Sequence, residues 1–427
     1  MYKIERLSGN FLWLLLDKAI VIVGGLLVGI WVARYLGPSD FGVLQYSLAL
    51  IAFLSFLSQL GLNQIVVREL TKSKELAGEI IGTCFVLKAL GGLLSVFLIV
   101  FFAWLLKGDS PLVFLVIVVV SLTYLFQAFD VATFYFESQL IGRSQVLPRI
   151  LSFLIGSILQ VSLILFNAEL VVFALLISLQ AAMLGVFQLL AIRDVLRKYP
   201  VRFSCYRARR LLQDSWVLML STFLIVIYTK IDQIMIEHYL GLTQVGIFSV
   251  AVRLSEVWYF FPAIIVSTLL PYFVRLREQD LDKYQAQLRA LYSFMFWLGV
   301  TVGVLVIVFG ESGIKSLFGS AYIGAYEALV LNVWSGIFVS QALARGIWMI
   351  SENLQRYRLY GNIAGVTLNI LCNILLIPRY GIAGAAFASL VTQGVGTWIV
   401  PLFFSPMRKS TLDLLRSVNP RYLFLKL

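Results

Sequence analysis

Charged residues are scarce in this sequence. They make up 13% of its 427 residues, whereas 60% of the side chains are hydrophobic. Soluble domains are typically about 45–50% apolar and about 25% charged, so a soluble protein is excluded. Long polar intervals are also missing, because the longest one, 193–213, is far shorter than a domain of about 50 residues or more. We therefore expect no attached catalytic or nucleotide-binding domain.

Cysteine and histidine are nearly absent. The three cysteines, Cys84, Cys205 and Cys372, are scattered and none belongs to a C-x-x-C pair, so we expect free thiols. His238 is the only histidine and lies at the end of an apolar run. This excludes a His-rich metal site, and any Ser-His or Cys-His catalytic arrangement that is not built around that one residue. The sequence predicts no cofactor, no metal centre and no enzymatic activity.

Apolar runs of about twenty residues or more fill most of the chain, and a helix of that length crosses a bilayer. The sequence predicts an all-α polytopic membrane protein with about 12 transmembrane helices. The predicted spans are 11–34, 41–62, 80–106, 112–137, 147–167, 169–192, 214–240, 245–272, 290–310, 323–351, 359–377 and 382–405.

Basic residues alternate between the predicted loops. With both termini cytoplasmic, 25 of the 34 Lys and Arg residues lie in cytoplasmic segments. Only Arg34, Lys107, Lys315 and Arg379 lie outside, so the positive-inside rule supports this orientation. The cluster from Arg193 to Arg210 is expected to lie on anionic headgroups, where losing Arg207 alone would matter little. The basic tail after 405 is interpreted as an interfacial helix.

A short motif occurs twice. Tyr35-Leu36-Gly37, followed by Gly42, recurs as Tyr239-Leu240-Gly241, followed by Gly246. Each copy joins the first and second helix of a six-helix half, and both halves enter from the same side because six is even. The sequence therefore predicts two parallel-repeat lobes around a central cavity. Their predicted bounds are 1–192 for the first lobe, 193–213 for a basic linker, 214–405 for the second lobe and 406–427 for a tail.

Around these motifs the sequence resembles the polysaccharide transporter, or oligosaccharide flippase, family. Its superfamily also contains multidrug and toxin extrusion transporters and peptidoglycan-precursor flippases. The matching residues are Ala33 to Pro38, Gly42, Asp232-Gln233, Tyr239 to Gly241, Pro262, Pro271 and Ile377 to Ile382. The resemblance implies alternating access and export of a polyprenyl-diphosphate-linked oligosaccharide across a bacterial plasma membrane. A polysaccharide polymerase and glycosyltransferases would then be its partners, and nucleic acid would not.

Two other functions stay open. A cation-coupled drug antiporter would have the same fold, but five cations within the spans favour an anionic substrate. A membrane-embedded glycosyltransferase or polymerase would also meet polyprenyl-linked sugars, but such chemistry usually needs larger extramembrane loops than these.

Apart from Arg34 and Arg149 at span ends, five cations lie in the interior of predicted spans, where a lipid-facing charge costs about 2.5–3.5 kcal/mol. They are the candidate substrate-binding residues, expected to contact the diphosphate as a ladder across the membrane: Lys18, Lys88, Lys230, Arg253 and Arg345. Arg253 could instead pair with Glu256 on the same helical face. Two acids in the spans, Asp130 and Asp232, are candidates for coupling transport to an ion.

Overall fold

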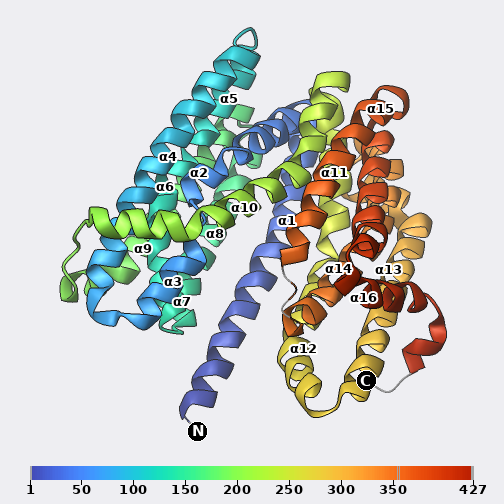
Figure 1. The fold of residues 1–427 in the computed structure, drawn as a ribbon. Coiled ribbons are helices and arrows are strands. Elements are labelled where there is room, and N and C mark those ends of the chain that lie inside the picture. The colour runs from blue at the N-terminus through green and yellow to red at the C-terminus, as the bar shows by residue number, and fades with distance from the viewer. Residues whose placement is uncertain (1, 353, 355, 425–427) are drawn as a thin grey trace. The chain divides into compact units, whose positions relative to one another are not determined.

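The computed structural model describes residues 2–352, 354 and 356–424, and this part of the chain is helical without a strand (Figure 1). The α-helices are α1 (Tyr2–Ala52), α2 (Ser55–Gln59), α3 (Leu62–Lys72), α4 (Ala77–Lys107), α5 (Pro111–Ser121), α6 (Thr123–Phe126), α7 (Val131–Ser138), α8 (Gly142–Leu165), α9 (Leu170–Lys198), α10 (Cys205–Leu240), α11 (Leu242–Val257), α12 (Phe260–Gln279), α13 (Leu281–Leu317), α14 (Ala325–Ser351), α15 (Arg356–Gly394) and α16 (Ser405–Arg416). The 3₁₀-helical turns are η1 (Lys74–Leu76), η2 (Gln127–Asp130), η3 (Ser320–Tyr322), η5 (Val400–Phe403) and η6 (Pro420–Phe424), and η4 (Val395–Ile399) is a π-helical turn.

Among the described residues, ten helical segments are long and apolar enough to cross a membrane. Two of them bend at a glycine of positive φ. Gly37 interrupts α1 with φ 71° and ψ 172°, and Gly381 interrupts α15 with φ 61° and ψ −144°. Each bend falls between two predicted spans. Gly37 directly precedes Pro38, and Gly381 follows Pro378 by three residues. The polytopic all-α architecture is confirmed, and the count of twelve separate spans stays a prediction.

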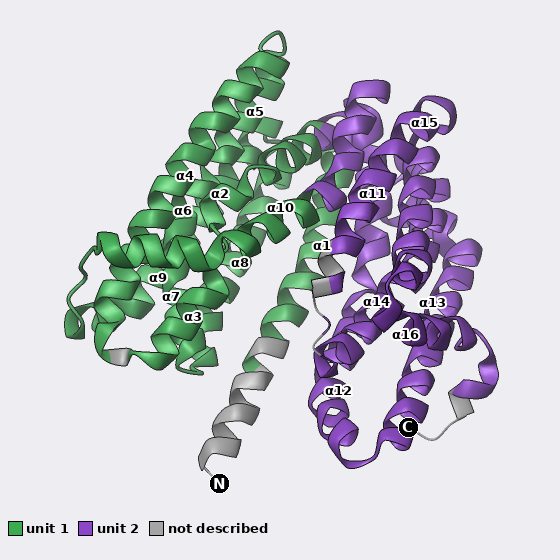
Figure 2. Ribbon diagram, in the orientation of Figure 1, with its two compact units in different colours: residues 1–36, 43–226 green, residues 37–42, 227–427 purple. Residues whose placement is uncertain are grey.

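The chain packs into two compact units (Figure 2). Unit 1 comprises Met1–Leu36 and Val43–Val226, and unit 2 comprises Gly37–Gly42 and Ile227–Leu427. The border after Val226 falls inside α10, so this helix contributes its first part to unit 1 and its second part to unit 2. The lobe bounds drawn from the sequence stay a prediction.

Unit 1 contains two broken segments that the sequence predicted as straight spans. The first ends at Ala52 and continues as α2 and α3, with the backbone turned at Leu60 and Gly61, which have φ of 53° and 61°. A side chain at Gly61 would also collide with the backbone of α10, so a glycine is needed there. The second break is η2, which divides α5 and α6 from α7 and carries Asp130.

The two copies of the repeated motif meet within unit 2. A Cβ added at Gly42 would collide with the carbonyl group of Leu242, and one added at Gly246 would collide with that of Pro38. The contact is reciprocal, because each copy supplies both a glycine and the carbonyl that faces it. Gly37 and Gly241, which precede these glycines, both adopt positive φ, 71° and 84°. The copies therefore match in backbone conformation as well as in sequence.

Candidate functional site

The candidate charges are divided between the two units. Lys18, Lys88 and Asp130 belong to unit 1, whereas Lys230, Asp232, Arg253 and Arg345 belong to unit 2. The ladder of phosphate contacts expected from the sequence therefore stays a prediction, and the environment of each charge is described within its own unit.

Lys88 and Asp130, two separate candidates from the sequence, form one ion pair. Lys88 on α4 is only 1% exposed, and its Nζ lies 3.3 Å from Oδ2 of Asp130. The Nζ also lies 5.2 Å from the centroid of the Phe134 ring, a cation–π distance. The other oxygen of Asp130 accepts a hydrogen bond of 3.4 Å from Nε2 of Gln188 on α9, which also donates to Thr133. The broken helix at η2 brings this carboxylate to the buried ammonium.

Lys18 lies on the surface of α1, and the acid beside it has another partner. Asp17 is 4% exposed and accepts a 2.6 Å bond from Nη1 of Arg149 on α8. Arg149 lies near the start of the predicted span 147–167 and was not among the candidates, so this pairing across two helices was missed. Asp17 is thus paired with Arg149, and Lys18 lies at an exposed position of unit 1.

Lys230 and Arg253 share one acid. Both are partly buried, on α10 and α11, and both act electrostatically on Glu256. The sequence offered only Arg253 as a partner for Glu256, through their spacing of three residues. The structure adds Lys230 from the neighbouring helix as a second cation that acts on Glu256.

Arg345 is a buried cation in a neutral environment. Its guanidinium group is held by a 2.8 Å hydrogen bond from Nη1 to the carbonyl oxygen of Thr397, and the residue is 5% exposed. Thr397 lies in η4, a π-helical turn. Among the side chains that the structure describes, no carboxylate pairs with Arg345. A guanidinium has five N–H donors, so Arg345 can bind an anion in addition to this carbonyl.

Asp232 is a buried anion surrounded by amides and hydroxyls. It is 7% exposed and accepts hydrogen bonds of 2.6 Å from Nδ2 of Asn373 and 2.7 Å from Oγ of Ser389. Asn373 also donates to Oδ1 of Asn369, at 3.2 Å. The Oδ1 atom of Asn373 and the Nδ2 atom of Asn369 are buried without a hydrogen-bond partner.

These oxygen atoms are the ligand type that hard cations prefer, with one negative charge among them. The described residues hold no cluster of three or more His, Cys, Asp or Glu suited to a metal ion. A cation site at Asp232 would therefore depend on amide and hydroxyl oxygens. Sequence reasoning selected Asp232 but missed its partners. The spacing of Asn369 and Asn373, one turn apart in an apolar span, was the available signal.

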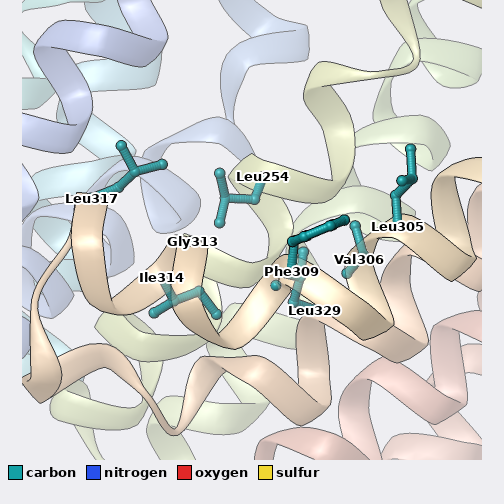
Figure 3. A pocket seen from close by; sticks show the side chains of 9 residues that line it. Leu254, Leu305, Val306, Phe309, Gly313, Ile314, Leu317 and Leu329 are labelled. Carbon is teal, nitrogen blue, oxygen red and sulfur yellow. The ribbon is translucent and has the colours of Figure 1, made fainter.

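An apolar pocket of about 350 Å³ lies elsewhere in unit 2 (Figure 3). It is lined by residues of α11, α13 and α14, namely Leu254, Leu305, Val306, Phe309, Gly310, Gly313, Ile314, Leu317 and Leu329. None of its lining residues is charged or carries a side-chain hydrogen-bonding group. It therefore suits hydrocarbon and not a phosphate group.

The basic linker is docked on unit 1. The backbone N–H of Ser204 donates to Oγ1 of Thr83 at 3.1 Å, and Nε of Arg207 lies 3.0 Å from Oε1 of Glu79. Gly78 and Gly82 let the linker approach α4 closely, because a Cβ at either would meet its backbone. Arg207 therefore has a specific partner on α4. Loop composition did not reveal this contact, and the expectation that the loss of Arg207 alone matters little stays a prediction.

Residues 7–277 match the family model described as polysaccharide biosynthesis protein. The chain is 24% identical over 374 residues to the probable low-salt glycan biosynthesis flippase of Haloferax volcanii, covering 86% of this chain and 76% of that protein. It is 22% identical over 397 residues to the capsular polysaccharide biosynthesis protein CapF of Staphylococcus aureus, covering 90% and 96%.

Two solved structures have a similar fold. One is the lipid II flippase MurJ in an inward closed conformation, with a TM-score of 0.71 at 14% identity over 95% of this chain and 91% of that chain. The other is a multidrug resistance MATE family transporter in an inward-facing conformation, with a TM-score of 0.63 at 15% identity over 96% and 99%. At such identities the similarity concerns the fold alone.

Proposed function

Because this chain belongs to the polysaccharide biosynthesis protein family, we propose that it is a flippase for a lipid-linked saccharide. Its substrate is a polyprenyl-diphosphate-linked oligosaccharide, which it moves from the cytoplasmic to the outer leaflet of a bacterial plasma membrane. Both termini lie in the cytoplasm, and transport proceeds by alternating access without covalent chemistry. The relatives named as a glycan biosynthesis flippase and a capsular polysaccharide biosynthesis protein support this assignment.

The observation that carries the proposal is the environment of Arg345. A buried guanidinium without a carboxylate is expensive in a membrane protein unless it serves a function. A diphosphate offers the charge and the paired oxygens that match the donors of this group. Arg345 is therefore the principal phosphate-binding residue, and Lys230 and Arg253, which both act on Glu256, supply a second contact.

Lys88 and Lys18 complete the candidate set in unit 1. The diphosphate would compete with Asp130 for Lys88, because Asp130 is partly exposed and can turn toward water when the ammonium binds a phosphate. Lys18 is exposed and needs no such exchange. The substrate class thus accounts for the cations in both units.

Ion coupling is assigned to Asp232. Its carboxylate, together with the side-chain oxygens of Asn369, Asn373 and Ser389, would hold a small cation, and the orphaned Oδ1 atom of Asn373 supports this arrangement. Asp130 is the second candidate, although its pairing with Lys88 already satisfies its charge.

The test uses proteoliposomes that contain a polyprenyl-diphosphate-linked oligosaccharide, with exposure of the sugar followed by an impermeant lectin. Arg345→Gln should weaken the substrate interaction by about 10- to 150-fold, which is the value of one charge-assisted contact of about 1.5–3 kcal/mol. Arg379→Gln, an exposed site in a predicted outer loop, is the control and should transport normally. Normal transport by well-folded Arg345→Gln protein would contradict the assignment.

A second candidate function is a cation-coupled drug antiporter, which the buried carboxylate of Asp232 favours. In that case Asp232→Asn would abolish efflux of a cationic dye, and the lipid-linked saccharide would not be transported. For a flippase, the same variant should retain saccharide transport but lose its dependence on the ion gradient. Glu237→Gln, on the same helix, is the matched control for both measurements.

A further inference from the structure

The C-terminal helix α16 has two faces of different character. Its inner face is buried and includes Met407, Ser410, Asp413 and Leu414. Its outer face exposes two leucines, Leu412 at 46% and Leu415 at 37%. Three exposed cations flank these leucines: Arg408, Lys409 and Arg416.

Specific contacts fix the inner face to unit 2. Oδ1 of Asp413 lies 2.8 Å from Nε of Arg289 on α13, and Oγ of Ser410 lies 3.3 Å from the hydroxyl of Tyr292. Leu414 is fully buried in the cluster that also contains Ala344, next to Arg345. Because these contacts determine the rotation of α16, the side that carries the leucines and cations points away from unit 2.

The outer face is positive. Asp413 is the only acid of α16, and it is turned inward and neutralised by Arg289. Arg408 donates from Nε to the carbonyl oxygen of Leu402 at 2.8 Å and keeps its other donors. Lys409 also acts on Glu352 at the end of α14, but Glu352 is already held by Arg277. Arg416 lies across the leucines from Arg408 on the same exposed face.

We propose that the outer face of α16 is a binding surface for anionic phospholipid. The helix begins at Ser405, directly after the last apolar segment, Tyr360–Phe403, which places it at the depth of the headgroups. Leucines that enter the boundary between headgroups and acyl chains, flanked by cations, are the pattern of a helix lying on a membrane. The three cations select anionic headgroups over zwitterionic ones.

The experiment measures the thermal unfolding midpoint of the purified full-length protein in detergent as dioctanoyl-phosphatidylglycerol is added. A ligand that binds the folded protein raises this midpoint according to its concentration and affinity. The anionic lipid should raise it, whereas dioctanoyl-phosphatidylcholine and inorganic phosphate at the same concentrations should not. An equal effect of either would overturn the proposal.

Two double variants, each of which removes two positive charges, locate the site. Each basic residue near an anionic surface strengthens binding about fivefold, so K409Q/R416Q should need roughly 30-fold more phosphatidylglycerol for the same shift. R275Q/K283Q removes two exposed cations from the α12–α13 end of unit 2 and should respond like the wild type. Equal responses of the two double variants would contradict binding at α16.

Leu412→Gln tests the apolar part of the surface without changing charge. It should also require more phosphatidylglycerol than the wild type, by a few-fold. If Leu412→Gln needs more phosphatidylglycerol than the wild type but K409Q/R416Q does not, the face binds an apolar surface. That result would overturn the assignment to anionic lipid.

Discussion

At the scale of single residues, Lys88 shows how a charge is kept within an apolar helix. Its side chain is 2% exposed, whereas that of its partner Asp130 is 34% exposed. A buried charge without a partner is far more costly than one that can reach water. The two members of the pair should therefore contribute unequally to stability.

This asymmetry gives the first prediction. Asp130→Asn leaves the ammonium of Lys88 buried without an acid and should lower the free energy of unfolding by about 1–3 kcal/mol. Lys88→Met leaves only the better-solvated Asp130 unpaired and should lower it by less. Denaturant unfolding in detergent measures both. The double variant should recover much of the unfolding free energy that Asp130→Asn loses. If the losses of the two single variants simply add in the double variant, a pairwise interaction is contradicted.

The second prediction concerns pH. Nε and Nη2 of Arg277 lie 2.7 Å and 2.8 Å from the two carboxylate oxygens of Glu352, and this bidentate bond lowers the pKa of Glu352 below its ordinary value of 4.5. A lowered folded-state pKa gives stability that is complete above the ordinary pKa and is lost as pH falls through the folded value.

The unfolding midpoint should therefore fall between pH 7 and pH 3.5 more for the wild type than for Glu352→Gln. The difference corresponds to about 1 kcal/mol, because the pair is partly exposed. Parallel pH profiles for the two proteins would show that this pair contributes nothing to stability.

Residue types in apolar spans were sufficient to select the charged candidates, but not their partners. Lys88 and Asp130 are 42 positions apart, and only the packing of α4 against η2 brings them together. Arg207 illustrates the same limit in a loop, where charge composition suggested seven equivalent residues. The fold pairs Arg207 with Glu79 on α4, whereas Arg193 and Arg197 pair only with the exposed Asp194 beside them on α9. Asn369 and Asn373 were missed because amides carry no charge and were not considered among the candidates.

At the scale of elements, glycine determines where the helices bend and how closely they pack. The recurring motif predicted equivalent turns, and Gly37 and Gly241 share a positive φ. The reciprocal contact of Gly42 and Gly246 was not predictable, because spacing along a chain does not reveal which carbonyl a helix will face. Likewise, apolar length predicted a straight span over 41–62, whereas the backbone conformation of Leu60 and Gly61 breaks it.

The third prediction follows from this reciprocal contact. Gly42→Val and Gly246→Val each place side-chain atoms against a backbone carbonyl, so each should destabilise the protein by about 1–3 kcal/mol or more. Gly346→Val is the control, because a Cβ at Gly346 has no atom within 4 Å. Thermal unfolding of the purified variants provides the measurement. Comparable midpoints for all three variants would contradict close packing of the two motif copies.

At the scale of the whole molecule, the bilayer makes the fold class the most predictable property. A chain with 13% charged residues must satisfy its backbone hydrogen bonds internally, and helices of about twenty apolar residues are the simple solution. The division into two units within α10 was not predictable, because the helix is continuous in sequence and hydropathy across the border. Charge in the loops predicts the orientation, which the helical packing of either unit does not test.

The last prediction tests that orientation. Cys205 at the start of α10 is exposed, whereas Cys84 is buried in α4 and Cys372 is partly covered in α15. If the basic linker is cytoplasmic, a membrane-impermeant maleimide should label Cys205 in inside-out vesicles and leave it unlabelled in intact cells. Cys205→Ser should remove nearly all of this labelling, because neither remaining thiol is well exposed. Labelling of Cys205 in intact cells would place the linker outside and would reverse the direction of transport assigned to the protein.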